Sequence, residues 1–249
     1  MEQVRERITL LDELRGAAIV LMFICHITFD IFLLSGNPGY YTTWIARNLA
    51  PITGGLFTFI SGVCSCYSRG TIRRGAIVFA AAMLITIATT QMGQNLNIYF
   101  GVLHMLGSCM ILAGLAAPLL NRVNPITGAA FSLLLYCAAV NLPVGYLGFG
   151  ALRIDLPAVL YQIGILFPLG FRTMGFFSAD YYPLLPWFFL FLAGRFVGAI
   201  TSKAALPESV YENRAVILSW MGGRSLAIYL IHQPLFVAIL WLGAKVLGL

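Results

Sequence analysis

Apolar residues occur in long runs that are separated by short polar breaks, a pattern typical of helices that cross a membrane. Runs long enough to cross a bilayer lie at about 14–35, 49–68, 75–91, 98–119, 126–142, 157–172, 181–200 and 225–247. The sixth run is short and bounded by Pro157 and Pro168, so the pattern predicts seven or eight spans. We therefore expect an all-α polytopic integral membrane protein, a bundle of seven or eight transmembrane helices that forms a single domain over residues 1–249.

The composition agrees with this class of protein. Apolar residues make up 60% of the chain and charged residues 10%, and the mean hydropathy is +0.89. Soluble domains carry about 25% charged residues, so a soluble fold would leave too much of this apolar surface in water. Charged residues precede the first run and no small-residue cleavage pattern follows it, which argues against a cleavable signal peptide.

The positive charges indicate an orientation in the membrane. The net charge of +6 is scattered through short loops, which fits membrane topology better than nucleic-acid binding. Arginines flank the first run and fill the loop at 69–74, whereas the loop at 92–97 has no charge. We therefore expect a cytoplasmic N-terminus. The loop that carries Lys203, Arg214 and Arg224 disagrees with an eight-span count, so the orientation of the last helices stays open.

The first apolar run carries four ionisable residues on one predicted helix face. Arg15 and His26 are eleven positions apart, which places them within roughly 20° of each other and about 16 Å apart along the axis. Asp12 and Asp30, eighteen positions apart, bracket the same stripe. Such groups are costly inside a membrane, and the stripe suits a long ligand with an anionic head. Asp30 follows His26 by one turn, so it either orients the imidazole as a general base or forms a structural pair with it.

The other two histidines also lie in apolar runs. His104 lies between Gly101 and Gly107 near a predicted helix start, and His232 is followed by Gln233 and a proline in the last run. For both histidines, a packing role and a functional role have equal weight. Two thiols stand in C-x-C spacing at 64 and 66 without a second thiol pair or a nearby histidine in sequence, so we predict no metal site.

Several segments resemble a known superfamily of membrane enzymes. They are Leu11–Met22 with the Arg15-x10-His26 spacing, Gly55–Gly62, Tyr99–Gly107, Asp180–Trp187 and Gly223–Pro234. Together they resemble the transmembrane acyltransferase superfamily, in particular the bacterial DUF1624 family. That family is related to YeiB-type proteins and to the catalytic domain of heparan-α-glucosaminide N-acetyltransferase. The similarity runs from about residue 10 to 240.

This resemblance implies an acyltransferase that moves an acyl group, expected to be acetyl, from cytoplasmic acyl-CoA to an acceptor hydroxyl or amine. The acceptor would be an envelope sugar, lipid or amine at the membrane or beyond it. Acetyl-CoA would be the co-substrate, without a metal, and the protein would lie in the bacterial inner membrane. A homodimer is possible, and no nucleic-acid partner is expected. The implied catalytic residues are His26, Asp30 and His104, and the implied CoA-binding residues are Asp12, Arg15, Arg73, Arg74, His232 and Gln233.

The chain departs from the animal heparan enzyme at one position. The histidine taken as catalytic in that enzyme aligns with about Asn37, and the position of His26 is an asparagine there. The role of His26 therefore follows the Arg-x10-His spacing of the wider acyltransferase group. The alternative is a proton-coupled transporter with His26, Asp30, His104 and His232 as a proton relay, although the chain lacks the paired repeats typical of transporters.

Overall fold

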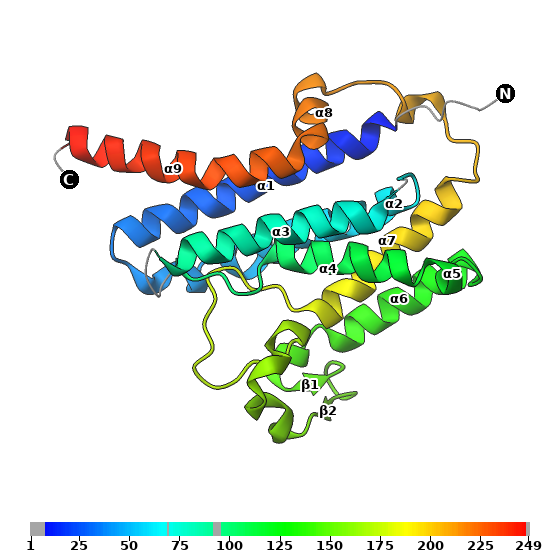
Figure 1. The fold of residues 1–249 in the computed structure, drawn as a ribbon, viewed down its shortest axis with the longest axis horizontal. Coiled ribbons are helices and arrows are strands. Elements are labelled where there is room, and N and C mark those ends of the chain that lie inside the picture. Colours follow the sequence, from blue (N-terminus) through cyan, green and yellow to red (C-terminus); the bar gives the residue numbers. More distant parts are fainter. Residues whose placement is uncertain (1–7, 69, 92–95, 248–249) are drawn as a thin grey trace. The chain divides into compact units, whose positions relative to one another are not determined.

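The structure is a computed structural model that describes residues 8–68, 70–91 and 96–247, and its elements are almost all helices (Figure 1). Among the described residues, four helices are long and apolar enough to cross a membrane, or five if the bent pair α8 and α9 forms one span. The prediction of an all-α polytopic membrane protein is thus confirmed.

The chain forms two compact units, one from residues 1–57 and 205–249 and the other from residues 58–204. The prediction of a single domain over 1–249 stays a prediction. The described elements of the first unit are α1 (Thr9–Leu34), the 3-10 helix η1 (Pro38–Thr42), the π-helix η2 (Ile45–Leu49), the start of α2 (Ala50–Ser65), η7 (Glu208–Val210), α8 (Val216–Gly223) and α9 (Ser225–Leu247).

In the first unit, one face of α1 is covered by α8 and then by α9. Glycines allow the closest approach to α8, because a Cβ atom on Gly16 would meet the carbonyl of Leu218. Farther along α1, Phe23 packs edge-to-face against Phe236 of α9. The axis bends by 91° between α8 and α9, at Arg224, and Gly222 at the end of α8 packs directly on the backbone carbonyl of Asp12 in α1. The face of α1 that carries the predicted polar stripe is thus the face that α8 and α9 bury.

The second unit pairs its helices through small residues. Its elements are the rest of α2, α3 (Thr71–Thr90), α4 (Val102–Leu115), α5 (Ala117–Leu120), α6 (Pro125–Ala139), η4 (Leu142–Val144), the antiparallel strands β1 (Tyr146–Leu147) and β2 (Ile154–Asp155), η5 (Ala158–Gln162), η6 (Gly164–Leu169) and α7 (Leu184–Thr201). A Cβ atom on Gly107 of α4 would meet Phe79 of α3, and one on Gly128 of α6 would meet the ring of Phe196 of α7. Close contact at small residues is how helices associate in lipid, where no hydrophobic force drives them together.

One of the predicted spans is wrong. The run at 157–172 forms η5 and η6 rather than an α-helix, and Ile163 between them is extended. Pro168 lies inside η6 and Pro157 directly precedes η5, and proline cannot donate the amide that an α-helix requires. Every other predicted run contains an α-helix.

Candidate functional site

The first unit joins two histidines that the sequence separates by most of its length. His26 of α1 and His232 of α9 stack with ring centroids 4.7 Å apart, and Nδ1 of His26 lies 2.5 Å from Nε2 of His232. His232 is 3% exposed, and Phe23 and Phe236 lie against its ring. These two phenylalanine rings hold the imidazole of His232 in its stacked position against His26.

The hydrogen bonds of this pair determine which nitrogen carries a proton. Nδ1 of His232 lies 2.6 Å from the carbonyl oxygen of Tyr229, and because a carbonyl only accepts, this Nδ1 donates. Nε2 of a neutral His232 then accepts, and the donor in the 2.5 Å contact is Nδ1 of His26. Nε2 of His26 is left with a lone pair and, among the described residues, without a hydrogen-bond partner. The arrangement presents one imidazole nitrogen as a base.

The one-turn spacing predicts a contact between Asp30 and His26, but in the structure Asp30 pairs with Gln233 instead. Nε2 of Gln233 donates to Oδ1 of Asp30 over 2.6 Å, and Asp30 is 1% exposed. Oδ2 of Asp30 and Oε1 of Gln233 are buried and have no hydrogen-bond partner within the described residues. His232 and Gln233 are adjacent in α9, so α9 supplies the partners of both His26 and Asp30. The four side chains form one cluster, which we call the α1–α9 polar cluster.

The remaining predicted residues of the first helix lie toward its N-terminal end. Nη1 of Arg15 is 3.6 Å from Oδ1 of Asp12, which is 5% exposed. This ion pair already engages the guanidinium that the sequence assigns to CoA phosphates. The side chain of Asn37, the approximate position that the resemblance relates to the histidine of the heparan enzyme, accepts a hydrogen bond from the amide of Gly39 at the start of η1.

His104 belongs to the second unit, where it caps the start of α4. Its Nδ1 accepts from the amide of Gly101 at 3.2 Å, so Nε2 carries the proton and donates to the hydroxyl of Thr86 at 3.1 Å. That hydroxyl donates in turn to the carbonyl of Ile98. Both ring nitrogens are therefore engaged in structure, and a catalytic role for His104 stays a prediction.

Arg73 and Arg74, the other predicted CoA ligands, are exposed in the first turn of α3 in the second unit. Their assignment to CoA stays a prediction. Within the described residues, no three His, Cys, Asp or Glu side chains are grouped so that they could hold a metal ion.

Asp180 is a partly buried acid to which the sequence analysis assigned no role. Its Oδ2 accepts a hydrogen bond of 2.9 Å from the amide of Val102, which caps α4 from a segment far away in sequence. Loss of hydration raises the pKa of Asp180 from 3.8 to about 6, although the bond from Val102 acts in the opposite direction. Only its place in the segment before α7 singled it out in sequence.

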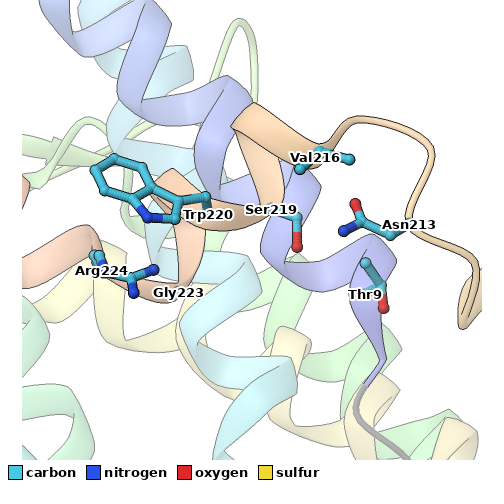
Figure 2. A pocket seen from close by; sticks show the side chains of 7 residues that line it. All are labelled: Thr9, Asn213, Val216, Ser219, Trp220, Gly223 and Arg224. Carbon is cyan, nitrogen blue, oxygen red and sulfur yellow. The ribbon is translucent and has the colours of Figure 1, made fainter.

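A cavity of about 660 Å³ opens beside the start of α1. It is lined by Thr9, Asn213, Val216, Ser219, Trp220 and Arg224, among others. Figure 2 shows Trp220 and Arg224 together at one end and Asn213 and Thr9 at the other, with Ser219 between them. Sequence analysis missed this cavity, because Arg224 lies beyond the end of α8, at the 91° bend, and helical spacing does not predict its contact with Trp220.

Apolar helices enclose a histidine pair in which, within the part of the chain that the structure describes, one ring nitrogen has no hydrogen-bond partner. These features define a polytopic membrane protein with an imidazole base inside a span. The chain belongs to the family described as heparan-alpha-glucosaminide N-acetyltransferase, catalytic, whose model matches residues 7–234. This confirms the family resemblance and implies a membrane-embedded acetyltransferase enzyme. No curated protein and no solved structure gives a significant match.

Proposed function

We propose that the protein transfers an acetyl group from cytoplasmic acetyl-CoA to a hydroxyl or amine acceptor, with Nε2 of His26 as the general base. The observation that carries the proposal is the hydrogen-bond chain from His26 through His232 to the carbonyl of Tyr229. In a neutral pair, this chain leaves a lone pair on Nε2 of His26. Family membership supports the acetyl group and, in general, a CoA-type donor.

In the proposed reaction, Nε2 of His26 accepts the proton of the acceptor hydroxyl or amine as its heteroatom attacks the thioester carbonyl. The bond between the carbonyl carbon and the CoA sulfur breaks, and the thiolate leaves with the electron pair. The proton on His26 then returns to that sulfur. While His26 is charged, its Nδ1–H points at His232, whose own Nδ1–H points at a carbonyl oxygen. This alignment spreads and stabilises the positive charge.

The proposed orientation places the start of α1 in the cytoplasm of a bacterial cell, with the protein in the inner membrane. The warrant is the arginine bias of the short loops. Arg15 is then near the cytoplasmic rim and His26 about 16 Å deeper along the same helix face. An extended pantetheine arm would follow this face from the rim to His26. Asp30 and Gln233 would support the cluster by holding α9 against α1.

The test is acetyl transfer by purified protein in liposomes, supplied with labelled acetyl-CoA. Glucosamine, an alkyl glucoside and a bacterial envelope extract serve as amine, hydroxyl and native acceptors. We expect His26→Ala to lower transfer by about 10²-fold or more. Thr28→Ala, on the same helix with a hydroxyl bonded to its own backbone at Ile24, is the matched control.

Full transfer by a folded His26→Ala protein would overturn His26 as the base. The same liposomes distinguish the transporter alternative, since proton-driven uptake of solute without acyl-CoA would favour it. Absence of transfer with every acceptor, together with such uptake, would overturn the proposed function itself.

A further inference from the structure

We infer that the cavity between the start of α1 and α8 binds the nucleotide end of the acyl donor. That end consists of a flat heteroaromatic base and a ribose that carries phosphates. The inference rests on the proposed function, because that function supplies a CoA donor. Its own warrant is the set of side chains that line the cavity, none of which sequence analysis assigned to a ligand. All of these residues belong to the first unit, as does the α1–α9 polar cluster.

Trp220 supplies a surface for the ring. Its side chain is 54% exposed and lines the cavity, as Figure 2 shows. A large aromatic side chain that is left half open at a cavity is suited to stacking against a base, which exposes a π-face of similar size. The volume of about 660 Å³ lies in the usual range of small-molecule sites.

Arg224 supplies the cation for a phosphate. Its guanidinium carbon lies 4.8 Å from the centre of the Trp220 ring, so charge and ring lie side by side. Two other arginines of this unit have carboxylate partners, namely Arg15 with Asp12 at 3.6 Å and Arg214 with Glu212 at 3.1 Å. Arg224 has no ion pair with any described carboxylate. Its charge and its fork of donors are therefore available to an anion.

The opposite end of the cavity is polar and uncharged. The side chains of Asn213 and Ser219 make no hydrogen bond with any described residue, so both can meet the hydroxyl groups of a ribose or further phosphate oxygens. The nearby carboxylate of Glu13 would repel an anion, but its Oε1 accepts from the amides of Arg214 and Ala215 at 2.7 and 2.8 Å. These two hydrogen bonds partly neutralise the carboxylate and so weaken its repulsion of an anion in the cavity.

The position of the cavity also suits a long donor. Thr9, which lines it, is the first residue of α1, and His26 lies on the same helix. The two positions are about 26 Å apart along the axis. A ligand with its nucleotide at Thr9 and its thioester at His26 must therefore be extended, with a narrow arm between two ends, as acyl-CoA is.

The experiment measures binding and transfer separately, on full-length protein in lipid nanodiscs. Calorimetry gives Kd for CoA, adenosine 3′,5′-bisphosphate, ATP and pantetheine. Transfer assays give KM and kcat with acetyl-CoA and with S-acetylpantetheine, which lacks the nucleotide. The variants are Trp220→Leu and Arg224→Gln. The controls are Trp44→Leu, another exposed tryptophan of the first unit, and Arg153→Gln, an arginine over a tyrosine ring in the second unit.

We expect CoA and adenosine 3′,5′-bisphosphate to bind, and both variants to raise these Kd values at least tenfold. The KM for acetyl-CoA rises to the same extent, whereas kcat with S-acetylpantetheine is unchanged and both controls behave as wild type. Unchanged CoA binding in both variants would overturn the inference while transfer still supported the proposed function. Binding of ATP without binding of CoA would overturn it too. Loss of all transfer, with bisphosphate binding that depends on Trp220, would instead count against the proposed function.

Discussion

Nδ1 of His26 and Nε2 of His232 lie 2.5 Å apart across the contact of α1 with α9, although 206 positions separate the two residues in sequence. Histidine is the side chain that most readily exchanges a proton near neutral pH. Two histidines that share one hydrogen, with a backbone carbonyl as the terminal acceptor, hold each other in one orientation. In the proposed reaction, the imidazole of His232 would take the orienting role that a carboxylate has in many catalytic sites.

Replacement of His232 tests this role. His232→Leu removes the acceptor for Nδ1 of His26, so the ring can rotate and its tautomer is no longer fixed. We expect kcat for acetyl transfer to fall by about 10²-fold, the loss that a misplaced catalytic group typically causes. His232→Gln retains an acceptor oxygen at a similar reach and should restore part of kcat. Equal loss in both variants with unchanged folding would contradict an orienting role through this hydrogen bond.

A second prediction concerns the charge on Asp30. Oδ2 of Asp30 and Oε1 of Gln233 are both acceptors without a described donor, a costly state for buried atoms. Asp30→Asn removes the charge, keeps an oxygen for Nε2 of Gln233 and adds an N–H donor. We expect Asp30→Asn to unfold at the wild-type temperature or above it. Asp30→Ala, which strands the amide of Gln233, should lose about 1–3 kcal/mol.

The measurement for Asp30 is thermal unfolding in detergent with a double-mutant cycle. The combined variant Asp30→Ala with Gln233→Ala should be destabilised less than the sum of the single variants, because the two side chains interact directly. Strict additivity would show that the hydrogen bond between them contributes nothing to stability.

A third prediction follows from the close approach of α1 to α8. A methyl group at Gly16 would meet the backbone carbonyl of Leu218, which cannot rotate away. Gly16→Ala should therefore lower the free energy of unfolding by about 1–3 kcal/mol, the usual cost of overpacking. Gly243→Ala in α9 is the control, since nothing lies within 4 Å of a Cβ atom there. This control should gain about 0.5–1 kcal/mol from the better helix former, and a stable Gly16→Ala protein would refute the close contact.

The fourth prediction is a pH dependence of stability in the second unit. The pKa of Asp180 is raised from 3.8 to about 6 by loss of hydration, so the folded state holds its proton more tightly than the unfolded state. The contribution of this tighter proton binding to the free energy of unfolding is fully present below pH 3.8 and is lost as the pH rises through about 6. The loss amounts to at most about 3 kcal/mol. Asp180→Asn keeps an acceptor for the amide of Val102 and does not titrate.

Unfolding temperatures of wild type and Asp180→Asn, measured between pH 4 and 7.5, check this sign. The wild-type temperature should fall relative to that of the variant as the pH rises. Parallel profiles of the two proteins would mean that Asp180 titrates alike in the folded and unfolded states.

Sequence reasoning placed the polar stripe of α1 correctly but misjudged its partners. The one-turn spacing of His26 and Asp30 is a property of a single helix, and from it we expected a contact between the two. In the structure, α9 brings two adjacent polar side chains to this stripe and divides them between His26 and Asp30. Which partner a side chain of α1 contacts depends on how α9 is placed along it. The spacing of residues within α1 carries no information about that placement.

The amino-acid sequence by itself determined the class of the protein, the helical runs and the family. Long apolar runs can satisfy their backbone polar groups in lipid only as helices, and the proline-rich run at 157–172 fails this test through its own residues. Only the tertiary structure decided how the polar residues combine. The imidazole pair and the Trp220–Arg224 cavity require the 91° bend between α8 and α9, which lets successive parts of one segment cover two parts of α1. Such a bend arises from the packing of whole helices, and its partners lie about two hundred residues apart.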